Sequence, residues 1–254
     1  MIKKNLLIGI FVFLIIGHLY AQKPKVKNDP NHDNRPIHFG FSLGINFMDF
    51  NVRNSKIAFD SGVVVDVLHL YPGFHVHAIV NFRMTDYFDF RLLPGISFGG
   101  ERELSYTQFR KPLISIRQED LPVRLESNFI EMPILIKYKS FRINNFRPYV
   151  IGGSNLRYDL AFTKKTWGKT EKHSSIILLK SFDAYYEIGI GFDFYLEYFK
   201  FTTEFKYSVG IRNVLKTKDK QGGNYIYPPA DLSIYTDLID RLNSRMFLIS
   251  FHFE

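Results

Sequence analysis

Residues 38–47, HFGFSLGINF, alternate without interruption between two kinds of side chain. The small or polar set is His38, Gly40, Ser42, Gly44 and Asn46, and the large apolar set is Phe39, Phe41, Leu43, Ile45 and Phe47. A period of two is typical of a β-strand whose two faces meet different surroundings. With Ile37 included, this segment is the first of eight; the others cover residues 73–83, 88–98, 129–138, 148–160, 183–196, 200–211 and 245–253. The sequence therefore predicts an all-β fold.

The connections between these segments alternate in length. Long links at residues 48–72, 99–128, 161–182 and 212–244 take turns with short ones at 84–87, 141–147 and 197–199. Such a rhythm is typical of an antiparallel up-and-down meander with all its long loops at one end. Outer-membrane barrels have an even number of strands, short periplasmic turns and long outer loops. With eight strands, both termini are expected on the side of the short turns.

The two faces of the eight segments differ in charge. Apart from Arg245, the first residue of the last segment, the large apolar faces contain no Asp, Glu, Lys or Arg. The opposite faces include six acidic and five basic residues, which could nearly neutralise one another: Asp89, Arg91, Glu131, Lys137, Arg157, Asp183, Glu187, Asp193, Lys200, Glu204 and Lys206. A Lys or Arg that faces lipid at the midplane of a barrel costs ~2–4 kcal/mol. The charged face is therefore predicted to line the interior and the apolar face to contact lipid.

These patterns together predict an eight-stranded antiparallel up-and-down transmembrane β-barrel, with short periplasmic turns and long extracellular loops. Strands of ~9–11 residues cross a bilayer at the usual tilt, and the ring must close because an unpaired edge has no partner in hydrocarbon. The alternative is a soluble lipocalin-like carrier, which would need an apolar cavity lining. An eight-stranded lumen has room only for its own side chains, so no wide channel is expected.

The N-terminal region divides into two expected segments. Residues 1–21 have a charged start, an apolar run and a cleavage site after Ala21, as in a secretory signal peptide. Residues 22–36, QKPKVKNDPNHDNRP, have little to bury and predict a disordered periplasmic tether. Residues 37–254 form the predicted barrel domain. The expected location is the bacterial outer membrane, with lipid around the wall and both termini in the periplasm.

The candidates for chemistry are weak. His75 and His77 point the same way on one strand and could begin a metal site, but a pairing with lumen carboxylates is the stronger interpretation. The carboxylates Asp183, Glu187 and Asp193 fit an interior ion-pair network better than acid–base catalysis. The chain has no cysteine. Its formal net charge is +8, but the basic residues form no stripe that would indicate binding of nucleic acid. We expect no catalytic residue, metal, cofactor or small-molecule substrate.

Several segments resemble one known family. HFGFSLGINFMDF, RLLPGISFG, EMPILIKYKS, RPYVIGGSNLRYDL and YYEIGIGFDFYLEYFKFTTEFKYSVGIRN together are similar to the PorT family of outer-membrane β-barrel proteins. GINFMDF and RLLPGISFG are the more specific parts, whereas Glu131-x-Pro133 and Arg147-Pro148-Tyr149 are widespread among small barrels of this superfamily. The resemblance implies a non-enzymatic role in the type IX secretion system and, in some bacteria, in gliding motility. It implies no catalytic residues.

One long link suggests a binding surface. Residues 212–244 carry apolar side chains that a purely solvated loop would lack: Tyr225, Tyr227, Leu232, Tyr235 and Leu238. An exposed patch of this kind indicates a partner, and other proteins of the secretion system are the expected ones. Two hypotheses follow. The chain is an accessory component of the secretion machinery, or it is a small porin, adhesin or ligand-binding barrel without a role in secretion.

Overall fold

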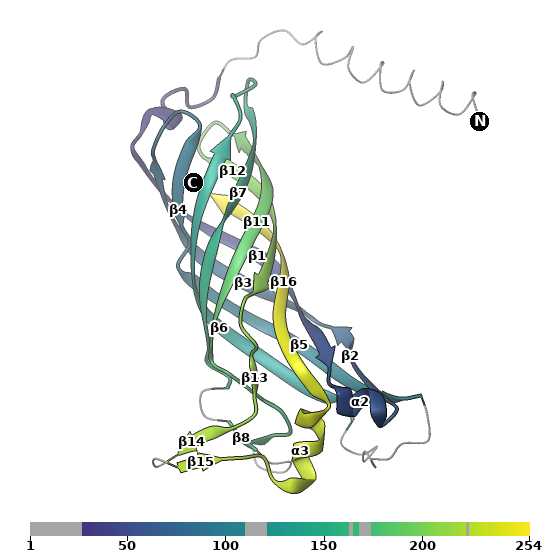
Figure 1. The fold of residues 1–254 in the computed structure, drawn as a ribbon. Coiled ribbons are helices and arrows are strands. Elements are labelled where there is room, and N and C mark those ends of the chain that lie inside the picture. Colours follow the sequence, from purple (N-terminus) through teal and green to yellow (C-terminus); the bar gives the residue numbers. More distant parts are fainter. Residues whose placement is uncertain (1–26, 110–120, 163–164, 168–173, 222–223) are drawn as a thin grey trace, which may run out of the picture.

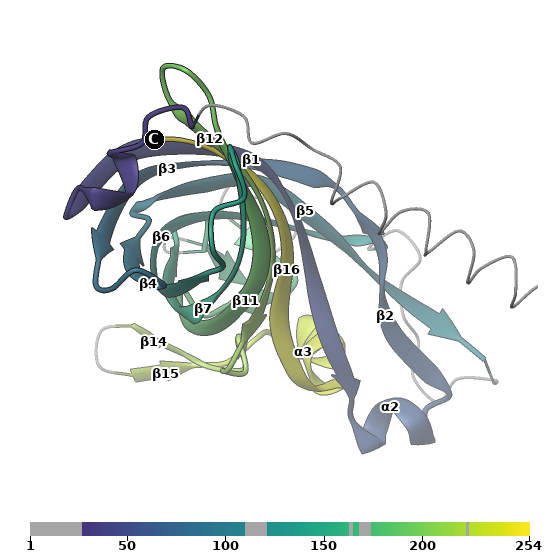
Figure 2. The same ribbon diagram turned by 90° about the horizontal axis from the view of Figure 1, so that it is seen from above.

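The computed structural model describes residues 27–109, 121–162, 165–167, 174–221 and 224–254. Long tilted strands curl into a ring, as Figure 1 shows from the side and Figure 2 along the barrel. The predicted signal peptide at 1–21 lies outside the described residues. In the part of the chain that the structure describes, no helix has the length and hydropathy needed to cross a bilayer.

The ring is built from strands that follow the predicted segments. They are β1 (Ile37–Asn54), β3 (Pro72–Arg83), β4 (Phe88–Leu92), β5 (Gly95–Gln108), β6 (Val123–Lys139), β7 (Phe146–Asp159), β11 (Phe182–Tyr195), β12 (Lys200–Gly210) and β16 (Ile239–Phe253). The third predicted strand is divided into β4 and β5 at Leu93 and Pro94. Proline has no amide hydrogen for the ladder, which explains the break. An additional strand, β2 (Val63–Leu70), pairs with β5.

The first and last strands close the ring. On one side β1 pairs with β16, in a ladder that runs from Phe41 opposite Phe253 to Arg53 opposite Arg241. On its other side β1 pairs with β3, from Ile37 opposite Phe82 to Phe47 opposite Pro72. Every neighbouring pair in this ten-stranded sheet is antiparallel. The predicted up-and-down barrel is therefore confirmed, with β2 as an addition to it.

The two ends of the barrel differ. We call the end with the short connections and the C-terminus the turn end, and the opposite end the cap end. At the cap end β1, β6 and β16 extend to 18, 17 and 15 residues, beyond the predicted segments. The cap also contains the helices α2 (Lys56–Asp60) and α3 (Ala230–Asp237) and six short strands. These are β8 (Thr166–Trp167), β9 (Ser174–Ser175), β10 (Leu178–Leu179), β13 (Leu215–Lys216), β14 (Asp219–Gln221) and β15 (Asn224–Ile226).

The outer face of the wall is apolar and exposed. Phe39 is 70% exposed and Ile188 is 65% exposed, and the same rows include Phe74, Ile136 and Val150. On β1 this row continues to Phe47, after which the outward residues are polar: Asp49, Asn51 and Arg53. The wall thus carries an apolar band that ends where the cap begins.

The cap has a hydrophobic core of its own. Its buried members come from the extended strands and from the long links: Phe50, Ala58, Val63, Val65, Leu104, Tyr106, Val123, Leu125, Phe162, Ile177, Leu178, Leu179, Val214, Leu215, Leu232, Tyr235, Leu238, Ile239 and Leu242. Burial of this much apolar surface stabilises the links as a folded layer. The cap therefore covers the lumen at this end with packed side chains.

This core corrects the predicted partner-binding loop. Leu232, Tyr235 and Leu238 are at most 2% exposed, and they pack inside the cap. The Tyr106 hydroxyl donates a hydrogen bond to the Tyr235 carbonyl oxygen at 3.1 Å. Tyr227 remains 62% exposed, and Tyr225 lies in β15, with its side chain outside the description. The loop is apolar because it completes a core within the same chain.

The predicted tether also differs from the structure over residues 27–36. A short 3-10 helix, η1 (His32–Asn34), forms there, and the segment makes hydrogen bonds to the turn end. The Asn28 amide N–H donates to Asn145 Oδ1 at 2.9 Å. Residues 22–26 lie outside the described part of the chain. Polar contacts, rather than buried apolar surface, hold this segment in place.

The cap core yields a first prediction. Leu238→Ala removes a fully buried side chain and should destabilise the cap by about 2–5 kcal/mol. Amide hydrogen exchange in residues 230–242, measured on the refolded barrel in micelles, should accelerate. The matched control is Tyr227→Ala, which removes an exposed side chain of the same link and should leave exchange unchanged. Equal exchange in the two variants would contradict the cap core.

Candidate functional site

The polar interior of the barrel is the main candidate site. All eleven charged residues of the predicted network lie inside, and none is more than 5% exposed: Asp89, Arg91, Glu131, Lys137, Arg157, Asp183, Glu187, Asp193, Lys200, Glu204 and Lys206. They come from five neighbouring strands of the ring: β4, β6, β7, β11 and β12. Ten of them join ion pairs, as described below. Asp183 instead accepts the Ala184 backbone N–H at 2.8 Å.

One cluster centres on Arg157 of β7. Its Nε contacts Glu131 Oε2 at 2.6 Å and its Nη2 contacts Glu187 Oε1 at 2.9 Å. The Asn155 side-chain amide donates to the same two carboxylates at 2.9 and 2.8 Å. His77 Nε2 lies 2.8 Å from Glu131 Oε1. Side chains of four strands, β3, β6, β7 and β11, are thus joined inside the lumen.

A second cluster centres on Glu204 of β12. Arg91, Lys206 and His252 approach its carboxylate at 3.5, 3.5 and 3.3 Å. The Tyr149 hydroxyl donates to it at 2.5 Å. Lys206 also lies 3.4 Å from Glu187, so it connects this cluster to the first one. Each charged side chain of these two clusters therefore has oppositely charged neighbours, which is the condition for burying it.

The remaining pairs lie toward the turn end. Lys137 Nζ lies 2.7 Å from Asp193 Oδ2 and 3.6 Å from the centroid of the Tyr149 ring. Lys139 lies 2.6 Å from Asp89. The C-terminal residue Glu254 points inward, at 2.7 Å from Arg91 and 2.8 Å from Lys200.

The network also includes four residues that were not predicted from the sequence: Lys139, Tyr149, His252 and Glu254. A signal for two of them was present. Lys139 lies two residues beyond Lys137, and Glu254 lies two beyond His252, so extension of the alternation past the assumed strand ends would have placed both inside. Tyr149 carries no charge, so the segregation of charged residues to one face did not identify it.

Small residues make room for the network. A side chain at Gly44 of β1 would overlap the ring of His75, and one at Gly191 of β11 would overlap the ring of Tyr149. These positions therefore require glycine because another side chain occupies the space. The small residues of the inner face and the large polar residues fill the lumen together.

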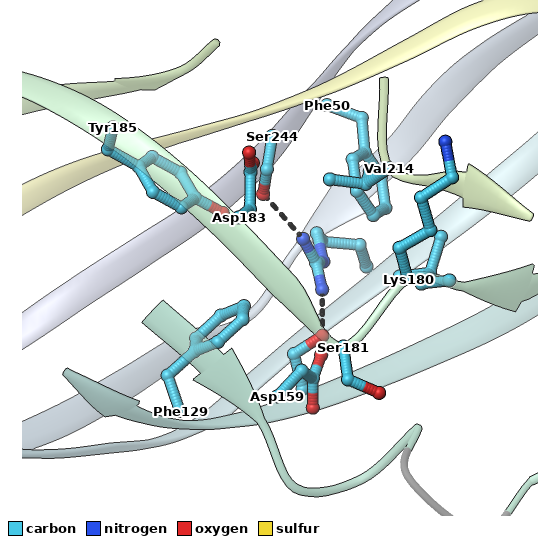
Figure 3. Close-up of a pocket in the computed structure, with 12 residues that line it drawn as sticks. Phe50, Phe129, Asp159, Lys180, Ser181, Asp183, Tyr185, Val214 and Ser244 are labelled. Carbon is cyan, nitrogen blue, oxygen red and sulfur yellow. Dashed lines mark hydrogen bonds between the residues drawn. The ribbon is translucent and has the colours of Figure 1, made fainter. Parts of the chain in front are cut away.

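A small cavity lies where the lumen meets the cap (Figure 3). It encloses about 10 Å³ beside Arg102, which is fully buried. Arg102 donates to Ser244 Oγ at 3.2 Å and to Ser127 Oγ. Its guanidinium carbon lies 3.9 Å from the centroid of the Phe50 ring. Asp159 and Asp183 also line this cavity. A volume of this size accommodates about one water molecule and leaves no passage.

The structure shows no third ligand for a metal site at His75 and His77 among the residues that it describes. Their rings lie 5.0 Å apart, but His75 contacts Ser250 Oγ at 2.9 Å and His77 contacts Glu131. Among the described residues, no group of three or more His, Cys, Asp or Glu side chains is arranged to hold a metal ion. Both imidazoles are parts of the polar network.

Comparison with known proteins gives a family. The model of the family described as "Outer membrane protein beta-barrel domain" matches residues 20–216, more than half of the chain. Among solved structures, the chain is similar to the outer membrane protein OprG from Pseudomonas aeruginosa. The sequence identity is 11% and the TM-score is 0.41, with 85% of this chain and 91% of that chain covered. No curated protein matches the chain.

The network yields a second prediction. Lys137→Met leaves the Asp193 carboxylate buried without its cation and should destabilise the barrel by about 3–5 kcal/mol. Removal of the acidic charge as well, in Lys137→Met/Asp193→Asn, should recover part of this loss. The measurement is the fraction folded against urea in lipid vesicles, read from gel mobility. The control Lys56→Met removes an exposed charge and should be neutral. A neutral Lys137→Met would contradict the pairing.

Proposed function

The chain belongs to the family of outer-membrane β-barrel domains, and from this premise we propose that it supports protein export by the type IX secretion system. In this role it is a non-enzymatic component of the outer membrane and acts through its two ends. Its partners are other proteins of the secretion machinery.

The filled lumen is the observation that carries this proposal. Ten buried charges are ion-paired inside the barrel, and the cap core packs over the cap end. A barrel of eight strands has little free interior to begin with. Such a protein fits the role of a scaffold in the membrane better than that of a conduit for cargo.

The link to secretion itself rests on the resemblance to the PorT family. Its more specific segments, GINFMDF and RLLPGISFG, lie in β1 and at the junction of β4 and β5. In both segments, outward aromatic residues alternate with inward small residues, so each segment contributes to the outer wall and to the lumen. Substrate, cofactor and catalytic roles form no part of the proposal.

The proposed orientation places the turn end, with both termini, in the periplasm and the cap outside the cell. Short turns face the periplasm and longer loops face outward in barrels of this kind. The secretion partners would then meet residues of the turn end from the periplasm, or the exposed cap from outside.

A second candidate is an adhesin or ligand-binding barrel unrelated to secretion. The surface of the cap favours it, because Phe59 is 74% exposed and Phe109 is 52% exposed, with their ring centroids 6.5 Å apart. An exposed apolar pair of this kind is a contact surface for another molecule. The porin form of this alternative is disfavoured by the filled lumen.

Deletion of the gene distinguishes the two candidates and gives a third prediction. Cargo proteins with a C-terminal sorting signal should accumulate inside the deletion strain, and the intact gene should restore their export. Complementation with the double variant Phe59→Ser/Phe109→Ser should restore export if the apolar pair serves adhesion alone. Normal export in the deletion strain would exclude the secretion role, and loss of surface binding there would favour the adhesin.

A further inference from the structure

The N-terminal segment, residues 28–35, lies against the turn end of the barrel through one acidic side chain. The Tyr195 hydroxyl donates to Asp33 Oδ1 at 2.7 Å. The same carboxylate lies 3.1 Å from Arg147 and 3.7 Å from Arg142. A carboxylate that receives a hydroxyl and two guanidinium groups is held by charge-assisted contacts, which are stronger than neutral ones.

The segment is held at a second point, five residues earlier. Besides the bond from its backbone N–H to Asn145, Asn28 donates from its side-chain amide to the Tyr195 carbonyl oxygen at 3.0 Å. Arg142 donates to the carbonyl oxygens of Asn28 and of Asp29, the latter at 3.3 Å. These contacts bind the backbone of the segment, whereas the contacts to Asp33 bind its charged side chain.

The barrel itself positions the groups that receive the segment. Arg147 Nε donates to the Ser140 carbonyl oxygen at 2.7 Å, across the turn between β6 and β7. In the same turn, Arg142 Nε donates to the Asn144 carbonyl oxygen at 2.8 Å. The Arg142 guanidinium stacks on the Tyr195 ring, with 3.6 Å between its carbon and the ring centroid. Arg142, Asn145, Arg147 and Tyr195, which we call the clasp site, are thus oriented by bonds to the barrel.

Charge favours an acidic occupant. Burial alone would raise the pKa of Asp33, but the hydrogen bond from Tyr195 and the charge of Arg147 outweigh it and hold this pKa below its usual value. Lys139 and Lys200 add to the positive potential around the carboxyl group. The Asp33 side chain is still 27% exposed, whereas those of Arg142 and Arg147 are 7% and 8% exposed. Water therefore reaches the carboxylate, and another carboxylate could replace it.

We propose that the clasp site is a receptor for a short acidic peptide segment, which the N-terminal segment of the same chain occupies until an acidic segment of a partner protein displaces it. The preferred ligand has a carboxylate five residues after a residue whose backbone is bound by Arg142. Exchange of the two segments would couple arrival of the partner to release of the N-terminus. The proposal does not depend on a role in secretion.

A spin label in the mature full-length chain tests this proposal. The chain has no cysteine, so Asn31→Cys gives a single labelling site, and residue 31 is exposed. The label should be largely immobile in the refolded barrel. A synthetic peptide with the sequence of residues 27–36, KNDPNHDNRP, should raise the mobile fraction in a saturable manner. The same peptide with Asn in place of the second Asp should need at least a tenfold higher concentration.

Three variants complete the test. Asp33→Asn in the chain should increase the mobile fraction without peptide, and Arg142→Gln should do so and also abolish the response to the peptide. A label at Tyr198→Cys, which replaces a 92% exposed residue of a neighbouring turn, should respond to neither. Heat-modifiable gel migration verifies that each variant is folded. Equal displacement by the acidic and the neutral peptide, or a label unaffected by Asp33→Asn, would overturn the proposal.

Discussion

Pairing of charges inside the ring is the constraint on which the barrel depends. A buried charge that loses its partner destabilises a protein by about 3–5 kcal/mol, a large part of the stability of a typical domain, because its desolvation is not compensated. Arg157 lies between Glu131 and Glu187, and Lys206 lies between Glu187 and Glu204. These contacts join β6, β7, β11 and β12 into one network. The inward direction of the charges leaves the outer wall apolar, and this is the condition for a lipid environment.

The same constraint explains the absence of a channel through the described interior. Each inward side chain needs partners within about 3–4 Å, so the side chains converge on the barrel axis and fill it. Glycines such as Gly44 and Gly191 admit the rings of His75 and Tyr149. Beyond the apolar band, where Arg102 and its cavity mark the boundary, hydrophobic packing replaces ion pairing. Ion pairs therefore fill the lumen within the apolar band, and hydrophobic packing closes it at the cap end.

Much of the fold could be predicted because its physical causes are local in the sequence. A period of two shows where the strands lie, and the segregation of charges to one face shows which face points inward. All eleven predicted network residues lie in the interior. The network's extension to Lys139 and Glu254 was not predicted because the alternation was not followed one residue past the ends of the predicted segments. The cap could not be predicted in this way. Leu232, Tyr235 and Leu238 have the spacing of one face of a short helix, but their burial depends on contacts with strands far away in the sequence. The contacts of Asp33 are equally non-local, since its partners lie in the turn between β6 and β7, in β7 and in β11.

The orientation of the two faces is the central claim, and single cysteines in this cysteine-free chain test it directly. A fluorophore on Ile188→Cys or Val76→Cys, both outward positions, should be quenched by brominated lipid in vesicles. Ser97→Cys and Ser208→Cys, which replace buried inward residues of similar size, should resist a water-soluble maleimide until the barrel is unfolded. Outward positions that escape the lipid quencher, together with inward thiols that react at once in the folded state, would contradict the account.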